Sequence, residues 1–144
     1  MFRILVVCVG NICRSPMAVA LLRQELTGKD VTIESAGLAS MAGDPIHPAA
    51  AKALDMHGLS MHTHVATQVD EGRVKRADMI LAMEKRHVAA LLAMYPEARK
   101  KTFLLGKWES DAEVADPYGR SDEAFAVALE AIRTAARSWK DRIE

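Results

Sequence analysis

The sequence predicts an α/β protein in which helices cover both faces of a parallel sheet. Short apolar segments rich in β-branched residues alternate with segments of helical periodicity, a pattern that favours parallel strands joined by right-handed crossovers. The first apolar segment, residues 4–7, has no polar residue on either face, as is typical of a central strand. The 144 residues contain no repeat, low-complexity tract or linker, so we expect one domain over residues 1–144.

The helices are predicted from apolar periodicity and from residues that begin or end helices. Ser15 is a preferred N-cap and Pro16 a preferred first helical residue, so the first helix should start here. Gly58 and Pro96 should end two later helices. We therefore expect helices at residues 16–26, 49–57, 70–76, 86–95 and 122–142.

Three further strands and a packed final helix complete the expected fold. Apolar segments between the helices predict strands at residues 31–35, 79–83 and 102–105. The last helix carries apolar residues at alternating spacings of four and three, which favours a face packed on the core over a coiled coil. That face contains Phe125, Leu129, Ile132, Ala136, Trp139 and Ile143.

The segment between the first strand and the first helix has the composition of a phosphate site. A cysteine, five residues and an arginine make one tight turn, in which backbone N–H groups can surround the sulfur while the guanidinium closes the rim. We expect Gly10 and Asn11 to supply unusual backbone dihedrals and Ser15 to donate a hydrogen bond to the sulfur. A thiolate is stabilised at such a position, so the loop suits phosphoryl transfer to sulfur. Its residues are Cys8, Val9, Gly10, Asn11, Ile12, Cys13, Arg14 and Ser15.

Single residues of this loop have ordinary explanations. A cysteine after an apolar strand is usually a small buried hydrophobe, and C-x5-R alone is a weak signal. Strand, glycine, asparagine, arginine and helix start together favour a site. The absence of a lysine after the loop argues against a Walker A nucleotide site.

The loop resembles the C-x5-R-S signature of the low-molecular-weight protein tyrosine phosphatases, and the resemblance extends over nearly the whole chain through Ser35-Ala36-Gly37 and Asp116-Pro117-Tyr118. It implies a Rossmann-like, four-stranded sheet and hydrolysis of phosphotyrosine through a phosphocysteine. Cys8 would be the nucleophile and Arg14 the phosphate ligand. Asp116 would protonate the leaving phenolate and then act as base towards water. On its own, Asp116 would be read as a turn residue.

The resemblance also implies a scaffold and a substrate cleft. Asn11, Ser35 and His64 should hold the phosphate loop in shape through hydrogen bonds. Tyr118 should form one wall of the cleft, where its alternative is a surface tyrosine packed on the last helix. The cleft residues are expected to be Ile12, Leu38 and Tyr118.

Residues 83–87, M-E-K-R-H, resemble the bacterial branch of this family, which is paired with tyrosine autokinases of capsule and exopolysaccharide export. Such an autokinase is the partner that the resemblance implies. Three other functions stay open. A protein arginine phosphatase of this fold favours threonine where this chain has Ile12, an arsenate reductase needs two further cysteines that do not occur after Cys13, and a phosphate-binding module would be catalytically idle.

Composition excludes other classes of function. The net charge is zero, with 50% hydrophobic and 26% charged residues, so we expect neither a nucleic-acid partner nor attraction to anionic lipid. Met1 leads directly into a strand, and no apolar run has the length of a membrane span, so a cytoplasmic location is expected. The sequence leaves the oligomeric state open.

The cysteines and histidines give no sign of a metal or cofactor. Two cysteines are too few for a disulfide framework, although Cys13 could trap an oxidised Cys8 as a disulfide. His57, His62 and His64 lack the spacing of a known metal motif. We expect His87 to lie on a helix surface, and we expect the methionines at 56, 61, 79, 83 and 94 to fill the core.

Overall fold

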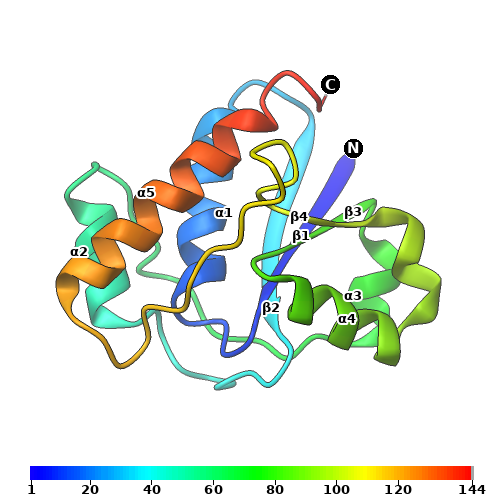
Figure 1. Ribbon diagram of the computed structural model, residues 1–144, viewed down its shortest axis with the longest axis horizontal. Coiled ribbons are helices and arrows are strands. Elements are labelled where there is room, and N and C mark those ends of the chain that lie inside the picture. Colours follow the sequence, from blue (N-terminus) through cyan, green and yellow to red (C-terminus); the bar gives the residue numbers. More distant parts are fainter. Residues whose placement is uncertain (144) are drawn as a thin grey trace.

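Four parallel strands form the central sheet of the computed structural model, which describes residues 1–143 (Figure 1). The strand order is β2-β1-β3-β4, so β1 is central, with its Val6 opposite Ser35 of β2 and Leu81 of β3. Parallel strands end at the same edge of a sheet, and Cys8 is the last residue of β1. The strands are β1 Phe2–Cys8, β2 Val31–Gly37, β3 Met79–Ala82 and β4 Thr102–Leu104.

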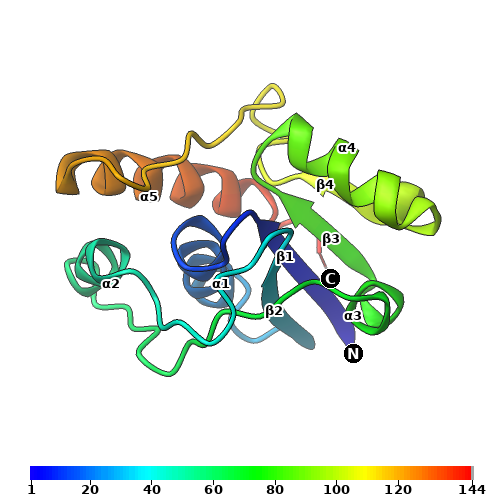
Figure 2. The same cartoon turned by 90° about the horizontal axis from the view of Figure 1, so that it is seen from below.

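Helices cover both faces of the sheet, which confirms the predicted three layers. α1, α2 and α5 lie on one face and α3 and α4 on the other, as two perpendicular views show (Figures 1 and 2). Ile4 and Val6 of β1 pack into the core under α1 and α5, while Leu5 and Val7 pack into the core under α3 and α4. The helices are α1 Arg14–Glu25, α2 Pro48–Asp55, α3 Glu71–Arg76, α4 Lys85–Met94 and α5 Asp122–Ser138.

The start of α1 differs from the prediction. The helix begins at Arg14, with Cys13 at the N-cap position and no side-chain capping bond. Ser15 was expected to cap the helix, and that prediction is wrong because its hydroxyl lies 2.9 Å from the Cys8 sulfur and accepts a hydrogen bond from Asn11. A tertiary contact therefore outweighs the local capping preference of serine.

The end of the chain also differs from the prediction. α5 ends at Ser138, four residues early, and Trp139 follows as the C-cap with its indole N–H donating to the carbonyl oxygen of Leu105 at 2.7 Å. A 3-10 helix at Pro96–Lys101, which was not predicted, connects α4 to β4. The predicted apolar face of α5 is buried in the core, including Phe125 and Ile132.

The methionines are divided between core and surface. Met79 and Met83 are buried and Met61 packs against the core, as predicted. Met56, with 78% of its surface exposed, and Met94 face solvent, so for these two the prediction is wrong. Met56 is the C-cap residue of α2, and Met94 is the last residue of α4.

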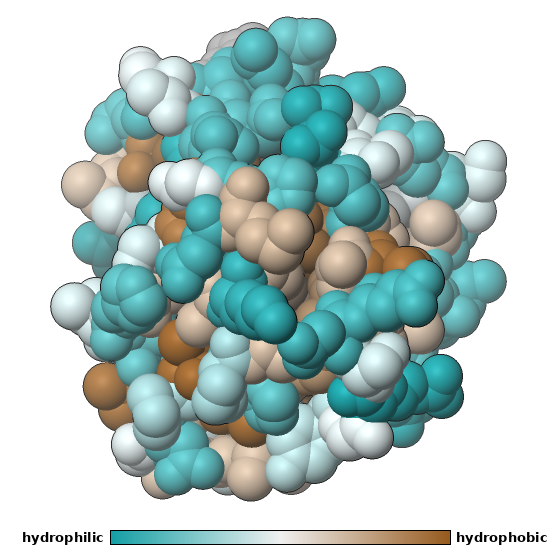
Figure 3. All heavy atoms as spheres, turned by 90° about the vertical axis from the view of Figure 1, so that its left-hand side faces the viewer, coloured by the Kyte–Doolittle hydropathy of each residue, from teal (hydrophilic) through white to brown (hydrophobic). Residues whose placement is uncertain are grey.

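The side of the molecule on which α2 and the start of α5 lie is mainly hydrophilic, with apolar side chains visible in several separate places (Figure 3). Among residues 1–143, no helix combines the length and the hydropathy needed to cross a bilayer.

Candidate active site

A cavity of about 240 Å³ opens at the carboxyl end of β1. It is lined by the loop from Cys8 to Arg14, by Ala39 and Met41 after β2, and by Asp116 and Tyr118 before α5. Open α/β sheets place their ligand sites at this edge. Residues far apart in the sequence therefore meet around the cysteine that the sequence singled out.

Asn11 is the structural centre of the loop. It is fully buried and its φ is 62°, in the left-handed region that asparagine tolerates. Its side-chain amide donates to the hydroxyls of Ser15 at 2.7 Å and Ser35 at 2.9 Å, and its side-chain oxygen accepts from the backbone N–H of Thr67 at 2.9 Å. His64 Nε2 donates to the Asn11 carbonyl oxygen at 2.6 Å. One residue thus connects α1, β2 and the segment after residue 60 to the loop.

Two glycines, Gly10 and Gly37, differ in what they contribute to the loop. Gly10 does not have a positive φ, so the prediction that the loop uses its conformational freedom is wrong. A Cβ at Gly10 would lie 3.6 Å from Met41, which places this glycine beside the cavity wall. A side chain cannot fit at Gly37, because its Cβ would lie 2.5 Å from the Val9 carbonyl oxygen. The end of β2 packs directly against the loop as a result.

The Cys8 sulfur is buried and lies 2.9 Å from the hydroxyl oxygen of Ser15. The Ser15 oxygen accepts from Asn11, and when Cys8 is a thiolate the Ser15 O–H is the donor to the sulfur, because a thiolate has no proton to give. Such a donor stabilises a thiolate, whether as nucleophile or as leaving group.

Cys13 is a poor competitor for the same chemistry. Both cysteines are free and buried. Burial, together with the neighbouring Cys8 and Asp116, raises the pKa of Cys13 to about 12. A thiol that stays protonated at neutral pH is a weak nucleophile.

Arg14 is buried, with 2% of its surface exposed, and is held from behind. Its Nη1 donates to Glu84 Oε2 at 2.5 Å and to the Val114 carbonyl oxygen at 2.8 Å. Its Nη2 lies 3.7 Å from Asp116 Oδ2 at the mouth of the cavity. The guanidinium is thereby oriented for bidentate binding of an anion.

Glu84, which the sequence did not indicate as part of the site, is a direct neighbour of Arg14. Burial opposes its ionisation, but hydrogen bonds from Arg86 and Arg14 outweigh that effect and lower the pKa of Glu84 to about 2. Its position two residues beyond the end of β3 could have indicated that Glu84 lies near the site, because parallel strands end at the same sheet edge as Cys8.

Asp116 and Tyr118 lie on the irregular segment before α5. The Asp116 side chain is 41% exposed, and its Oδ1 accepts from the Tyr118 backbone N–H at 3.0 Å. The Tyr118 ring meets His47 edge-on at 5.7 Å, and His47 in turn stacks on Phe125 at 4.8 Å. His47, also missed, supports the wall that the tyrosine forms.

The opposite wall is not formed by Leu38. β2 continues to Gly37, and Leu38 keeps the alternation of that strand, so its side chain packs with Ala36 on the core under α3 and α4. Ala39 and the half-exposed Met41 take its place beside the cavity. Ile12 lines the cavity as expected and is buried.

The other histidines have ordinary partners. His57 lies 3.5 Å from Glu130, and His62 lies 3.8 Å from Asp55. Within residues 1–143, no group of three or more histidine, cysteine or acidic side chains is arranged to hold a metal ion.

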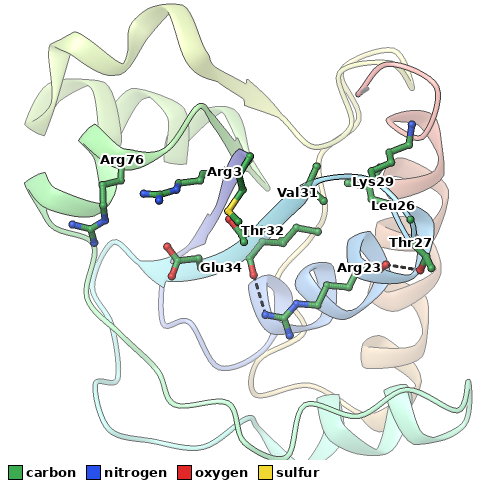
Figure 4. Close-up of a pocket in the computed structure, with 12 residues that line it drawn as sticks. Arg3, Arg23, Leu26, Thr27, Lys29, Val31, Thr32, Glu34 and Arg76 are labelled. Atoms are coloured by element: carbon green, nitrogen blue, oxygen red, sulfur yellow. Dashed lines mark hydrogen bonds between the residues drawn. The ribbon is translucent and has the colours of Figure 1, made fainter.

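A larger hollow of about 730 Å³ lies at the other end of the sheet, beside the first residues of β1 and β2 (Figure 4). Arg3, Arg23 and Arg76 surround it, and Arg23 donates to the Ile33 carbonyl oxygen at 2.9 Å, which protects the edge strand. Neither cysteine lines it. The smaller cavity alone of these two unites a nucleophile, a cation and a carboxyl group.

Comparison with known proteins agrees with this chemistry. Residues 3–144 match a sequence model of the family described as low molecular weight phosphotyrosine protein phosphatase. The chain is 44% identical over 137 residues to the low molecular weight protein-tyrosine-phosphatase Wzb of Salmonella typhi. The aligned residues make up 95% of this chain and 91% of that protein.

Two solved structures are similar in fold over nearly the whole chain. The tyrosine phosphatase AmsI of Erwinia amylovora has a TM-score of 0.93 at 39% identity, covering 99% of this chain and 93% of that chain. The YwlE arginine phosphatase of Geobacillus stearothermophilus has a TM-score of 0.92 at 32% identity, covering 99% and 92% respectively.

Proposed function

Because the chain belongs to the low molecular weight phosphotyrosine protein phosphatase family, it is a protein-tyrosine-phosphatase, and we propose that Cys8, Arg14 and Asp116 carry its reaction. One observation supports these roles above all. The loop that holds the Cys8 sulfur also holds Arg14, and Arg14 Nη2 lies 3.7 Å from Asp116 at the mouth of the same cavity. Nucleophile, phosphate ligand and proton donor thus surround the space that a phosphoryl group would fill.

The first step transfers the phosphoryl group to sulfur. Backbone N–H groups of the loop and the Arg14 guanidinium bind the phosphate oxygens, whose charge they stabilise. The Cys8 thiolate attacks phosphorus, so the phosphorus–sulfur bond forms as the bond to the tyrosyl oxygen breaks. Asp116 gives its proton to that oxygen, and neutral tyrosine leaves.

The second step returns the enzyme to its starting state. Asp116, now a carboxylate, takes a proton from water, and the water oxygen attacks phosphorus. The phosphorus–sulfur bond breaks, inorganic phosphate leaves, and Cys8 is again a thiolate. Ser15 stabilises the departing sulfur through its hydrogen bond at 2.9 Å.

The supporting residues hold this geometry. Asn11, Ser35 and His64 fix the backbone of the loop through the hydrogen bonds described above, and Gly37 lets β2 pack against it. The rest of the loop, Val9, Gly10, Ile12 and Cys13, contributes backbone groups around the phosphate. The reaction as proposed needs no metal and no cofactor.

Aryl selectivity follows from the walls of the cavity. Tyr118 and Met41 both line the cavity, and their apolar surfaces suit a flat ring. Arginine phosphatase activity is the second candidate, favoured by the similarity to YwlE. Ile12 presents an apolar side chain to the cavity, and it supports phosphotyrosine over the polar phosphoguanidinium.

We further propose that the physiological substrate is a phosphotyrosine protein, namely a tyrosine autokinase of exopolysaccharide synthesis or export. The resemblance of residues 83–87 to the bacterial branch and the similarity to Wzb and AmsI support this. A reaction that depends on a free thiolate favours a reducing compartment, so we propose the cytoplasm as its location.

Turnover of p-nitrophenyl phosphate in the presence of a chelator tests the assignment. We expect Cys8→Ser to abolish phosphate release and Asp116→Asn to lower kcat on the order of a hundredfold or more. Cys13→Ser is the matched control and should keep most of the activity. Equal, mild losses in all three variants would contradict the roles. Peptides carrying phosphotyrosine or phosphoarginine then separate the two candidate activities.

A further inference from the structure

His87 is buried beside the active site, although the sequence placed it on a helix surface. It is the third residue of α4, and only 2% of its surface is exposed. Within the part of the chain that the structure describes, neither ring nitrogen has a hydrogen-bond partner. Buried polar groups are almost always hydrogen-bonded, so an unpartnered imidazole calls for an explanation.

A carboxylate lies close to the His87 ring. His87 Nε2 lies 3.4 Å from Glu84 Oε2, just beyond an aligned hydrogen bond. The same Oε2 accepts from Arg14 Nη1 at 2.5 Å. His87, Glu84 and Arg14 therefore form a chain of contacts from the first turn of α4 to the phosphate loop.

The charged groups around His87 come from three elements. Arg14 belongs to α1, Glu84 and Arg86 to the start of α4, and Asp116 to the loop that forms the cavity wall. Burial and Arg14 lower the pKa of His87, while Glu84 opposes them. The imidazole is neutral at neutral pH, so one of its nitrogens carries a proton and can donate it in a hydrogen bond.

We propose that His87 is a positioning residue for Arg14, acting through Glu84: its Nε2–H donates to the carboxylate and sets how firmly that carboxylate holds the guanidinium. This inference rests on the proposed function, since Arg14 matters as the phosphate ligand. The separation of 3.4 Å is short enough that a small rotation of the imidazole or of the carboxylate, when phosphate is bound, would direct Nε2–H at Oε2. Catalytic hydrogen bonds often tighten in this way only when the ligand is bound.

A neutral donor is suited to this position. Glu84 is a negative charge close to the bound dianion, and a hydrogen bond from His87 disperses that charge without replacing Arg14 as its partner. Protonation of His87 would add a positive charge near the anion. By linkage, anion binding must then raise the pKa of His87.

Two substitutions separate the hydrogen bond from the packing. His87→Leu fills the space without an N–H, and His87→Gln retains an N–H near the place of Nε2. We expect His87→Leu to raise both KM for p-nitrophenyl phosphate and the dissociation constant of sulfate about tenfold, with a much smaller change in kcat. His87→Gln should lie within about threefold of the wild type. Equal binding of sulfate by the leucine variant and the wild type would overturn the proposal.

A double-mutant cycle tests the route through Glu84. In a Glu84→Gln background, His87→Leu should have no further effect on sulfate binding, because the carboxylate that His87 addresses is gone. Additive losses would overturn the proposal, since they would mark a role in packing alone. Sulfate binding is measured by calorimetry without turnover, so failure of this inference is distinct from failure of the phosphatase reaction.

An NMR titration of the His87 ring in the wild type keeps the test independent of any variant that fails to fold. Sulfate stays a dianion throughout the titration, so any change in ring protonation belongs to the protein. Saturating sulfate should raise the pKa of His87, and an unchanged pKa would overturn the proposal.

Discussion

Replacing Asn11 with alanine should lower the stability of the protein strongly. The side chain makes three hydrogen bonds, to Ser15, Ser35 and the backbone N–H of Thr67, each contributing about 1 kcal/mol net. Alanine at a φ of 62° adds about 1 kcal/mol of backbone strain. We therefore expect Asn11→Ala to lower the free energy of unfolding by about 4 kcal/mol.

Urea unfolding followed by circular dichroism measures this loss, and p-nitrophenyl phosphate turnover at a temperature where the variant is folded measures its effect on the loop. Ser35→Ala is the matched control. It removes one of the three bonds at a partly buried site and should cost about 1 kcal/mol. If Asn11→Ala lost no more stability than Ser35→Ala, Asn11 would not be the structural centre of the loop.

Three further predictions concern other residues of the site. Ser15→Ala should slow breakdown of the phosphocysteine roughly tenfold, because a hydrogen bond to a charged group contributes about 1.5–3 kcal/mol. A stopped-flow burst of the released phenol that is no larger than in the wild type would contradict this prediction. The folded-state pKa of Glu84 is about 2, below its ordinary 4.5, so the ionised side chain stabilises the fold above pH 4.5 and this stabilisation is lost as pH falls towards 2. In urea unfolding, the free energy of unfolding of Glu84→Gln should therefore fall less over this pH range than that of the wild type. Parallel pH profiles of the two proteins would contradict this prediction. Ile12→Thr should raise the rate on phosphoarginine peptides relative to phosphotyrosine peptides, and an unchanged ratio would remove Ile12 as a determinant of selectivity.

The predictable parts of the fold and the site are those whose signal is local. Strand β1 is apolar on both faces, so its central place in a parallel sheet follows from its own residues. Asn11 is one of the few residue types that accept a left-handed conformation, and its φ of 62° agrees with that expectation. The position of Cys8 at the carboxyl end of a strand was likewise readable from the sequence.

The parts that could not be predicted depend on distant contacts. Glu84 bonds to Arg14 across 70 residues of sequence, and no spacing rule identifies such a pair. His87 follows a helical pattern that fits a surface as well as a buried position. Ser15 has the residue type of an N-cap, but its hydroxyl finds a stronger partner in the thiol of Cys8. Local rules fail at these positions because the site itself uses the side chains.

Strand length explains the error at Leu38. The predicted second strand ended at residue 35, which left the direction of the following side chains open. The observed β2 ends at Gly37, and the alternation of its side chains carries Leu38 to the face covered by α3 and α4. Leu38 consequently does not line the cavity, whereas Met41 does.

Direct detection of the phosphorylated cysteine tests the central claim. Asp116→Asn protein, in which breakdown of the intermediate is slowed, is mixed with p-nitrophenyl phosphate, quenched within the first turnover and digested for mass spectrometry. We predict that the phosphoryl group is found on Cys8 and that Cys8→Ser shows neither this adduct nor turnover. A phosphoryl group on Cys13 or another residue, or continued release of phosphate by Cys8→Ser, would contradict the account.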